Sequence, residues 1–274
     1  MKRLVNLQPS GRLRWCLNLL PFLLLTVVYL GMSKARLAEN ASDPLLPSPA
    51  AMGKAFWRLA FEPSRRTGEL VLLNDTLASL EHLILGVGIS AAIALVFGLL
   101  NGGLPLVRAT FSPLVTVVSL IPPMAILPVL FIAFGTGETA KIALIAIGVT
   151  PFLIRDLEGH ALQLPAEQRI KAQTLGANSW QILLRVMLPQ LLPRLIASVR
   201  LALGTAWLFL IAAEAIAAQE GLGYRIFLVR RYLAMDIILP YVAWITALAF
   251  ASDWALAWLS RRAFGWYHAA GRGH

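Results

Sequence analysis

The chain has 274 residues, of which 58% are hydrophobic and 14% are charged. Soluble globular domains carry about 25% charged residues, so this composition excludes a soluble protein and indicates one that crosses a membrane several times. The net charge of +10 comes from basic residues scattered between apolar segments. That pattern argues against nucleic-acid binding and fits membrane topology and contact with anionic lipids. The single cysteine, Cys16, excludes an internal disulfide framework.

A basic N-terminus precedes the first apolar segment, residues 17–32. Extended back to Trp15, this segment approaches the roughly 20 residues that a membrane-spanning helix needs. Basic residues favour the cytoplasmic side, so residues 1–33 are predicted to be a cytoplasmic N-terminus and a first transmembrane helix. The same pattern also fits a cleaved signal peptide, which is the alternative interpretation.

Residues 34–75 are richer in proline and charge. They are predicted to form a periplasmic linker with a helical piece near residues 50–61, in which Phe56 and Trp57 anchor at the membrane interface.

The second predicted span, residues 76–100, carries a small residue at every fourth position. These residues are Gly86, Ser90, Ala94 and Gly98. At this spacing they share one helix face and let another backbone approach closely. We expect the seam to pack against a helix of this chain or of a second copy.

The third predicted span, residues 111–134, is interrupted by adjacent prolines at 122 and 123. A proline pair removes backbone donors at bilayer depth, which is tolerated where the freed carbonyls meet protein or water. We therefore expect the break to border a path across the membrane, with a simple packing kink as the alternative. The residues assigned to this path are Ser119, Pro122, Pro123 and Met124.

Three further spans are predicted at residues 139–154, broken or ended near Pro151, at 195–217 and at 237–259. The result is six spans with both termini in the cytoplasm and a cytoplasmic tail at 263–274. Lysine and arginine are in modest excess on the predicted inner side. Among the basic residues on the predicted outer side, Arg65, Arg66, Arg230 and Arg231 fit this rule least.

Ionisable groups inside membrane spans are costly and indicate function. Glu81 and His82 in the second span and Glu214 in the fifth are such groups. Together with Trp207 they are predicted to line or gate the path.

The long polar stretch from residue 166 to 193 separates two apolar spans. A first helix is expected to end near Leu175, followed by Gly176 in the left-handed conformation and by Asn178 as the N-cap of a second helix. Pro189 and Pro193 are expected to close that second helix. Its mixed polar and apolar surface predicts an exposed apolar knob, which suits docking into the groove of a partner protein.

In this stretch Gly176 is followed, after nine residues, by Val-Met-Leu-Pro at 186–189. The spacing resembles the EAA loop of bacterial ABC importer permeases, in which Glu-Ala-Ala, three residues, Gly and nine residues precede Ile-x-Leu-Pro. Only the second alanine of the triplet is kept, as Ala172, because Ile170 and Lys171 occupy the other two positions. From about residue 76 to 261, including Gly-Leu-Gly at 221–223, the chain is similar to permeases of the nitrate, sulfonate, taurine and bicarbonate type.

This resemblance implies an all-α membrane protein with the six-helix fold of a type I ABC importer transmembrane domain. Residues 76–262 would form the permease core of five spans, with a cytoplasmic coupling helix at about 166–182. The residues implied to couple the chain to an ATPase are Lys171, Gln173, Thr174, Leu175, Gly176, Ala177, Asn178 and Ser179.

The sequence contains no Gly-x-x-x-x-Gly-Lys-Ser/Thr loop, so ATP and Mg are expected on a separate ATPase subunit and not in this chain. The chain is therefore not expected to be an enzyme, and no cofactor or metal is expected in it. His160 after Asp156 and Glu158 lacks the His-Glu-x-x-His spacing of a metal site. The implied partners are a second permease copy, two ATPase subunits, a periplasmic or lipid-anchored solute-binding protein and the lipids of a bacterial inner membrane, without nucleic acid.

The cargo implied by the resemblance is a small nitrate-, sulfonate-, taurine- or bicarbonate-like solute. His82 stands where this family branch commonly has a stronger base, and the adjacent Glu81 lowers the local positive charge further. A cationic or neutral urea- or guanidine-like solute is therefore the alternative cargo. From another class, an ATPase-independent secondary transporter would show inverted repeats and mid-membrane charge relays, which the sequence lacks. A further alternative is a structural membrane scaffold, but that function would give the glycine-centred polar stretch no role.

Overall fold

The computed structural model describes residues 10–40, 43–64 and 68–270. Every regular element in these residues is helical, which confirms the all-α prediction. The basic residues before position 10, together with Arg65 and Arg66, lie outside the described residues.

Within the described residues, four helices are long and apolar enough to cross a membrane. They are α1 (Gly11–Glu39), α3 (Val71–Gly103), α11 (Met235–Ala263) and a composite helix from α8 (Ser179–Gln181) through η2 (Ile182–Met187) to α9 (Leu188–Ala217). The pair α4 (Pro105–Ser119) and α5 (Pro123–Phe134) makes a fifth candidate, although its two halves are bent by 95°. The predicted interruption of the third span is thus a sharp corner.

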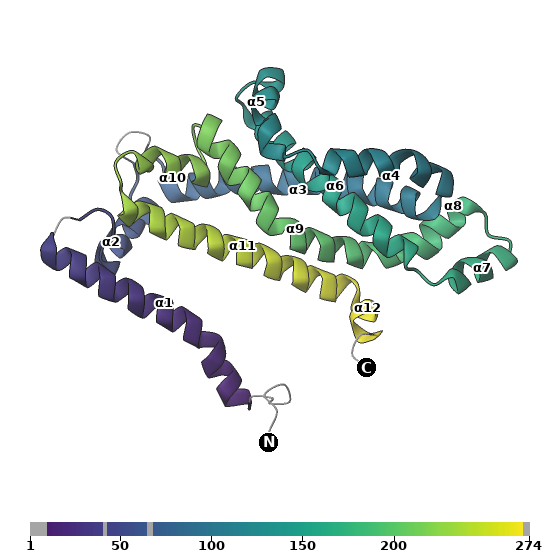
Figure 1. Ribbon diagram of the computed structural model, residues 1–274, viewed down its shortest axis with the longest axis horizontal. Helices are drawn as coiled ribbons and strands as arrows, with labels where there is room; N and C mark the ends of the chain where they lie inside the picture. Colours follow the sequence, from purple (N-terminus) through teal and green to yellow (C-terminus); the bar gives the residue numbers. More distant parts are fainter. Residues whose placement is uncertain (1–9, 41–42, 65–67, 271–274) are drawn as a thin grey trace.

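The remaining predicted span corresponds to α6 (Glu138–Leu162), which does not belong to this apolar group. It was expected to break or end near Pro151, yet it continues through that buried proline for three more turns. Helix α6 lies among α3, α4 and α9 (Figure 1), and neighbouring helices can satisfy the groups that a proline frees.

Enclosure by protein also explains the polar groups of α6. Asn101 of α3 donates to Glu158 Oε2 at 3.2 Å, and Ser198 of α9 donates to the Asp156 carboxylate. Because these partners come from protein and not from lipid, α6 can carry ionisable residues that a lipid-facing helix would not tolerate.

The small-residue seam of α3 packs against α6. A Cβ added at Gly86 would lie 2.7 Å from Ile145 Cβ, and one added at Gly98 would lie 2.6 Å from Leu157 Cβ. Both pairs are separated by 59 residues, so the two helices run parallel in constant register. The seam is therefore a close backbone contact within one chain.

The long helices carry shorter elements at both ends. Helix α2 (Pro49–Phe61) confirms the predicted helical piece and packs on α11, where the Phe56 and Trp244 rings are 5.9 Å apart. Helix α10 (Leu222–Arg230) lies between α9 and α11, in the interval that separates the predicted spans at 195–217 and 237–259. Figure 1 shows α2 and α10 at one end of the long axis, with α7 (Ala166–Thr174), α8 and α12 (Gly265–Ala270) toward the other.

Alanine substitution in α3 tests the seam. We expect Gly98→Ala to lower the free energy of unfolding by about 1–3 kcal/mol, because the new methyl group overlaps Leu157 in a packed contact. Gly88, on the same helix, is the control, since nothing lies within 4 Å of a Cβ added there. Thermal unfolding in detergent checks both variants, and equal losses at the two positions would contradict the close approach.

Candidate functional site

The polar stretch forms the turn that the sequence predicted. Helix α7 ends at Thr174, and Gly176 adopts φ +82°. Its N–H donates to the Gln173 carbonyl at 2.9 Å. Asn178 then caps α8: its side chain accepts from the Gln181 N–H, while the Gln181 side chain accepts from the Asn178 N–H, both at 2.9 Å. This capping box satisfies two backbone donors at the helix start.

The prediction that Pro189 and Pro193 close the second helix is wrong. The helix continues without a break from Ser179 to Ile216 over 38 residues. The π-helical residues of η2 end two positions before Pro189, so the winding of the helix changes where the proline removes a backbone donor. Pro193 is enclosed within α9 by neighbouring helices. The turn is thus rigidly continuous with a membrane-spanning helix.

We call residues 166–181 the coupling segment. Its apolar side chains Ile170, Leu175 and Trp180 are exposed, Leu175 to 87%. This confirms the apolar knob. Behind it, Ile182, Leu183 and Met187 are buried against the ends of α3 and α6 in a small core that includes Leu99 and Ala161. One side of the turn is anchored in the protein, and the other presents a hydrophobic surface of the kind that docks into a groove.

Of the residues predicted for the path, four lie at one corner of the chain, two meet inside the protein, and Glu81 and Trp207 lie apart from both groups. Ser119, Pro122, Pro123 and Met124 lie at the corner between α4 and α5, on the surface of the chain or only partly covered. There the Ser119 hydroxyl accepts from Arg155 Nη1 at 3.0 Å and donates to the Thr116 carbonyl at 2.7 Å.

The second group lies inside the protein, near the end of the long helices that carries α2 and α10 (Figure 1). His82 and Glu214 are brought together there, with Nδ1 and Oε1 3.4 Å apart. Glu214 is fully buried, and its carboxylate accepts from the Ser79 hydroxyl at 2.8 Å and the Gly223 N–H at 2.9 Å. Glu81, adjacent to His82 in the sequence, is exposed and does not join this cluster.

Trp207, also predicted for the path, is buried in the core of α9 and its neighbours. Its indole Nε1 has no hydrogen-bond partner among the described residues.

A second carboxylate, Asp75, completes the cluster and was not singled out from the sequence. Its side chain is 1% exposed and accepts from Arg225 Nε at 2.8 Å, Tyr241 OH at 3.0 Å and the Gly221 N–H at 3.2 Å. Burial alone would lower the pKa of Arg225, but the hydrogen bond and negative charge of Asp75 raise it above its ordinary value. We call Asp75, Ser79, His82, Glu214, Arg225 and Tyr241 the buried polar cluster.

The cluster fixes α10 to the long helices. The start of α10 lies so close to Glu214 that a Cβ at Gly221 would be 2.6 Å from the Glu214 carboxyl carbon, and Gly221 itself has φ +113°. A signal for the cluster was present in the sequence, because Asp75, Ser79 and His82 are spaced by four and three residues and share one helix face. That face continues directly into the small-residue seam.

Asp75→Asn tests this anchoring. We expect the free energy of unfolding to fall by about 3 kcal/mol, because the partly buried Arg225 guanidinium would lose its charged partner. Glu81→Gln on the same helix is the control and should leave stability unchanged, since Glu81 is exposed. Thermal unfolding of both variants checks the expectation. An Asp75→Asn protein as stable as the parent would show that the ion pair does not hold α10.

Comparison with solved structures supports the fold. The chain matches a structure of the methionine ABC transporter MetNI, described as inward facing, with a TM-score of 0.62. The match covers 70% of this chain and 95% of that chain at 24% identity. Together with the all-helical architecture, this likeness confirms the predicted type I ABC importer transmembrane fold.

Comparison with known sequences identifies the relatives. The chain is 36% identical over 201 residues to the taurine transport system permease protein TauC of Escherichia coli K12, covering 73% of this chain and 72% of that protein. It is 30% identical to the bicarbonate transport system permease protein CmpB of Synechococcus elongatus, covering 93% of this chain and 94% of CmpB. The family of binding-protein-dependent transport system inner membrane components matches residues 80–265. The chain therefore belongs to this family and is a multi-pass permease subunit of an ABC importer.

Proposed function

We propose that the permease works as a homodimer with two separate ATPase subunits, which bind ATP and Mg, and with a periplasmic or lipid-anchored solute-binding protein. The observation that carries the proposal is the coupling segment, which exposes an apolar knob on a base anchored in the core. The lack of a phosphate-binding loop in this chain supports a separate site of ATP hydrolysis. In this arrangement the coupling segment and both termini are cytoplasmic, and α2 and α10 are periplasmic.

The composite helix from Ser179 to Ile216 supplies the mechanical connection. Its 38 residues correspond to about 57 Å of helix along the axis at 1.5 Å per residue. One end continues from the coupling segment, and Glu214, near the other end, holds α10. Closing of two ATPases would draw the two coupling segments together, and the helix would carry that displacement toward the outer end.

The residues predicted for the path then take different roles. Ser119, Pro122, Pro123 and Met124 are accessible on one copy, so we assign them to the lining between two copies. His82, Trp207 and Glu214 are buried within one copy, so we assign them to the support of the outer gate, where they do not touch the solute.

The turn at Gly176 provides the test of coupling. We expect Gly176→Val to reduce solute-stimulated ATP hydrolysis, because a β-branched residue in the left-handed conformation costs roughly 1–2 kcal/mol and displaces the knob. Gly176→Asn is the matched control, since asparagine tolerates this conformation. ATPase assays on the assembled importer, with membrane insertion checked in parallel, separate the two. Full stimulation in the valine variant would argue against a rigid coupling turn.

For the cargo we propose a small sulfonate or related oxyanion. The names of the relatives TauC and CmpB support this class. The guanidine-like alternative rested on a lowered positive charge along the path at positions 81 and 82. In the folded chain, however, His82 is buried against Glu214, so of these two positions only Glu81 is accessible, which weakens that argument.

Uptake assays test the cargo. In proteoliposomes that hold the permease, its ATPase and its binding protein, we expect ATP-dependent uptake of taurine that excess ethanesulfonate inhibits and guanidinium does not. Inhibition by guanidinium alone would favour the cationic cargo. Uptake of equal rate without ATP would support a secondary transporter and contradict the proposed function.

A further inference from the structure

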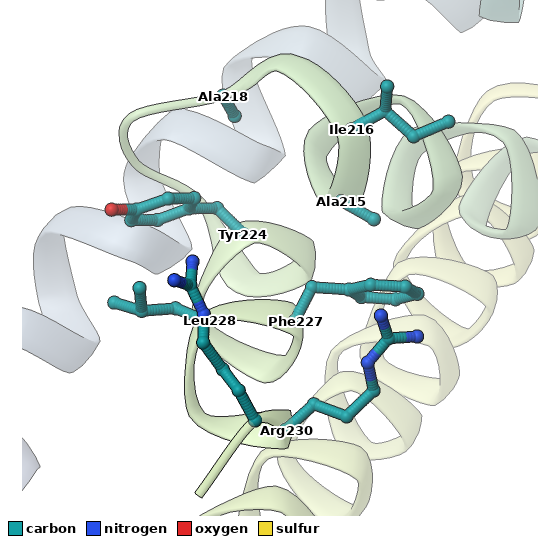
Figure 2. Close-up of a pocket in the computed structure, with 8 residues that line it drawn as sticks. Ala215, Ile216, Ala218, Tyr224, Phe227, Leu228 and Arg230 are labelled. Atoms are coloured by element: carbon teal, nitrogen blue, oxygen red, sulfur yellow. The ribbon is translucent and has the colours of Figure 1, made fainter.

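A pocket between the end of α9 and α10 is not explained by the functions described so far. It has a volume of about 500 Å³, within the usual range for small-molecule sites of about 300–1,000 Å³. Figure 2 shows the aromatic side chains Tyr224 and Phe227 of α10 together with Arg230, next to Ala215 and Ile216 of α9. Arg231 also lines it, and none of the eight lining residues is acidic.

The arginines of α10 divide into two kinds. Arg225 is held by the Asp75 carboxylate through two hydrogen bonds. Arg230 and Arg231 have no carboxylate partner among the described residues. The Arg230 guanidinium lies over the Phe227 ring, 4.7 Å from its centroid, which orients it without neutralising it.

The backbone does not cancel this charge. The pocket adjoins the C-terminal ends of α9 and α10, each of which contributes a partial charge of about −0.5. Two guanidinium groups therefore leave an excess of about one positive charge. A single anionic group would balance it.

The position of these arginines is unusual for a membrane protein. On the proposed topology they lie on the periplasmic side, where the positive-inside rule disfavours them. Helix α10 is also fixed, because the buried polar cluster holds its first turn through Gly221, Gly223 and Arg225. Unpaired charges on a fixed element that borders a pocket are the arrangement of a preorganised ligand site.

We propose that this pocket is a weak binding site for a small oxyanion, a sulfonate or carboxylate, which Arg230 and Arg231 hold beside the rings of Tyr224 and Phe227. The inference rests on the proposed function, since it places the site on the periplasmic face of an importer of small anions. It adds a recognition site within the permease itself, separate from the binding protein.

Saturation-transfer NMR on the purified full-length chain tests the site, with taurine as the probe. We expect transfer to the taurine methylene protons, reduced by about tenfold in Arg230→Gln/Arg231→Gln because charge-assisted hydrogen bonds to the anion are lost. Arg58→Gln removes an exposed arginine of α2 and should leave the signal unchanged. Ethanesulfonate should compete with taurine, and guanidinium should not. An equal signal in the double variant and the parent would overturn the proposal.

A second arm separates cargo from lipid, because a phospholipid headgroup offers the same anionic chemistry. Native mass spectrometry counts the phosphatidylglycerol that remains bound to the parent and the double variant. Lipid loss in the double variant, with no taurine signal in the parent, would assign the pocket to a headgroup and overturn the cargo site. If the double variant instead lost affinity for the binding protein, and the parent again gave no taurine signal, the pocket would be a protein contact. That result would also overturn the cargo site.

Failure of the site and failure of the proposed function give different results. Taurine uptake by the assembled importer, with no effect of the double variant on the NMR signal, would remove only the pocket. The proposed topology is tested by Tyr232→Cys in a Cys16→Ser background, because Tyr232 is exposed beside the pocket. We expect an impermeant maleimide to label it from outside intact cells. Labelling only after permeabilisation would overturn both proposals.

Discussion

The close approach of α3 and α6 is the contact on which the rest of the structure depends. Lipid is as apolar as a leucine side chain, so helices in a membrane associate through tight packing and internal hydrogen bonds. Gly86 and Gly98 bring the two backbones together, which encloses α6 within protein. Only because α6 is enclosed can Asp156 and Glu158 find partners on its neighbours.

The same face of α3 organises the opposite end of the molecule. Nearer the N-terminus of α3, the same face carries Asp75, Ser79 and His82. These side chains meet Glu214 of α9 and the glycine-rich start of α10. Buried carboxylates are costly unless they are paired and fully hydrogen-bonded. Here the partners come from α3, α9, α10 and α11, so the polar groups specify how four helices meet. A single helix face thus sets both the packing in the middle and the position of α10.

The composite helix connects this cluster with the coupling segment. Its π-helical turns lie directly before Pro189, so a sequence signal that normally ends a helix marks a local change of winding. This continuity gives the permease one stiff element between the surface proposed to meet an ATPase and the element proposed to border the outer gate. The pocket proposed to bind an anion lies at the far end of that element, between α9 and α10.

The sequence by itself determined the features that depend on neighbouring residues. Gly176 and Asn178 form the predicted turn because backbone conformation and capping are local properties. The apolar segments identify the membrane helices because lipid exposure imposes composition directly. Only the tertiary structure decided that α6 runs through Pro151, that the helix continues past Pro189, and that Glu214 meets Ser79, 135 residues away in the chain. At Pro151 and Glu214 the cost of a proline or a buried charge is offset by groups from other helices, which no local pattern contains, whereas the exposed Pro189 is accommodated by the π-helical residues before it.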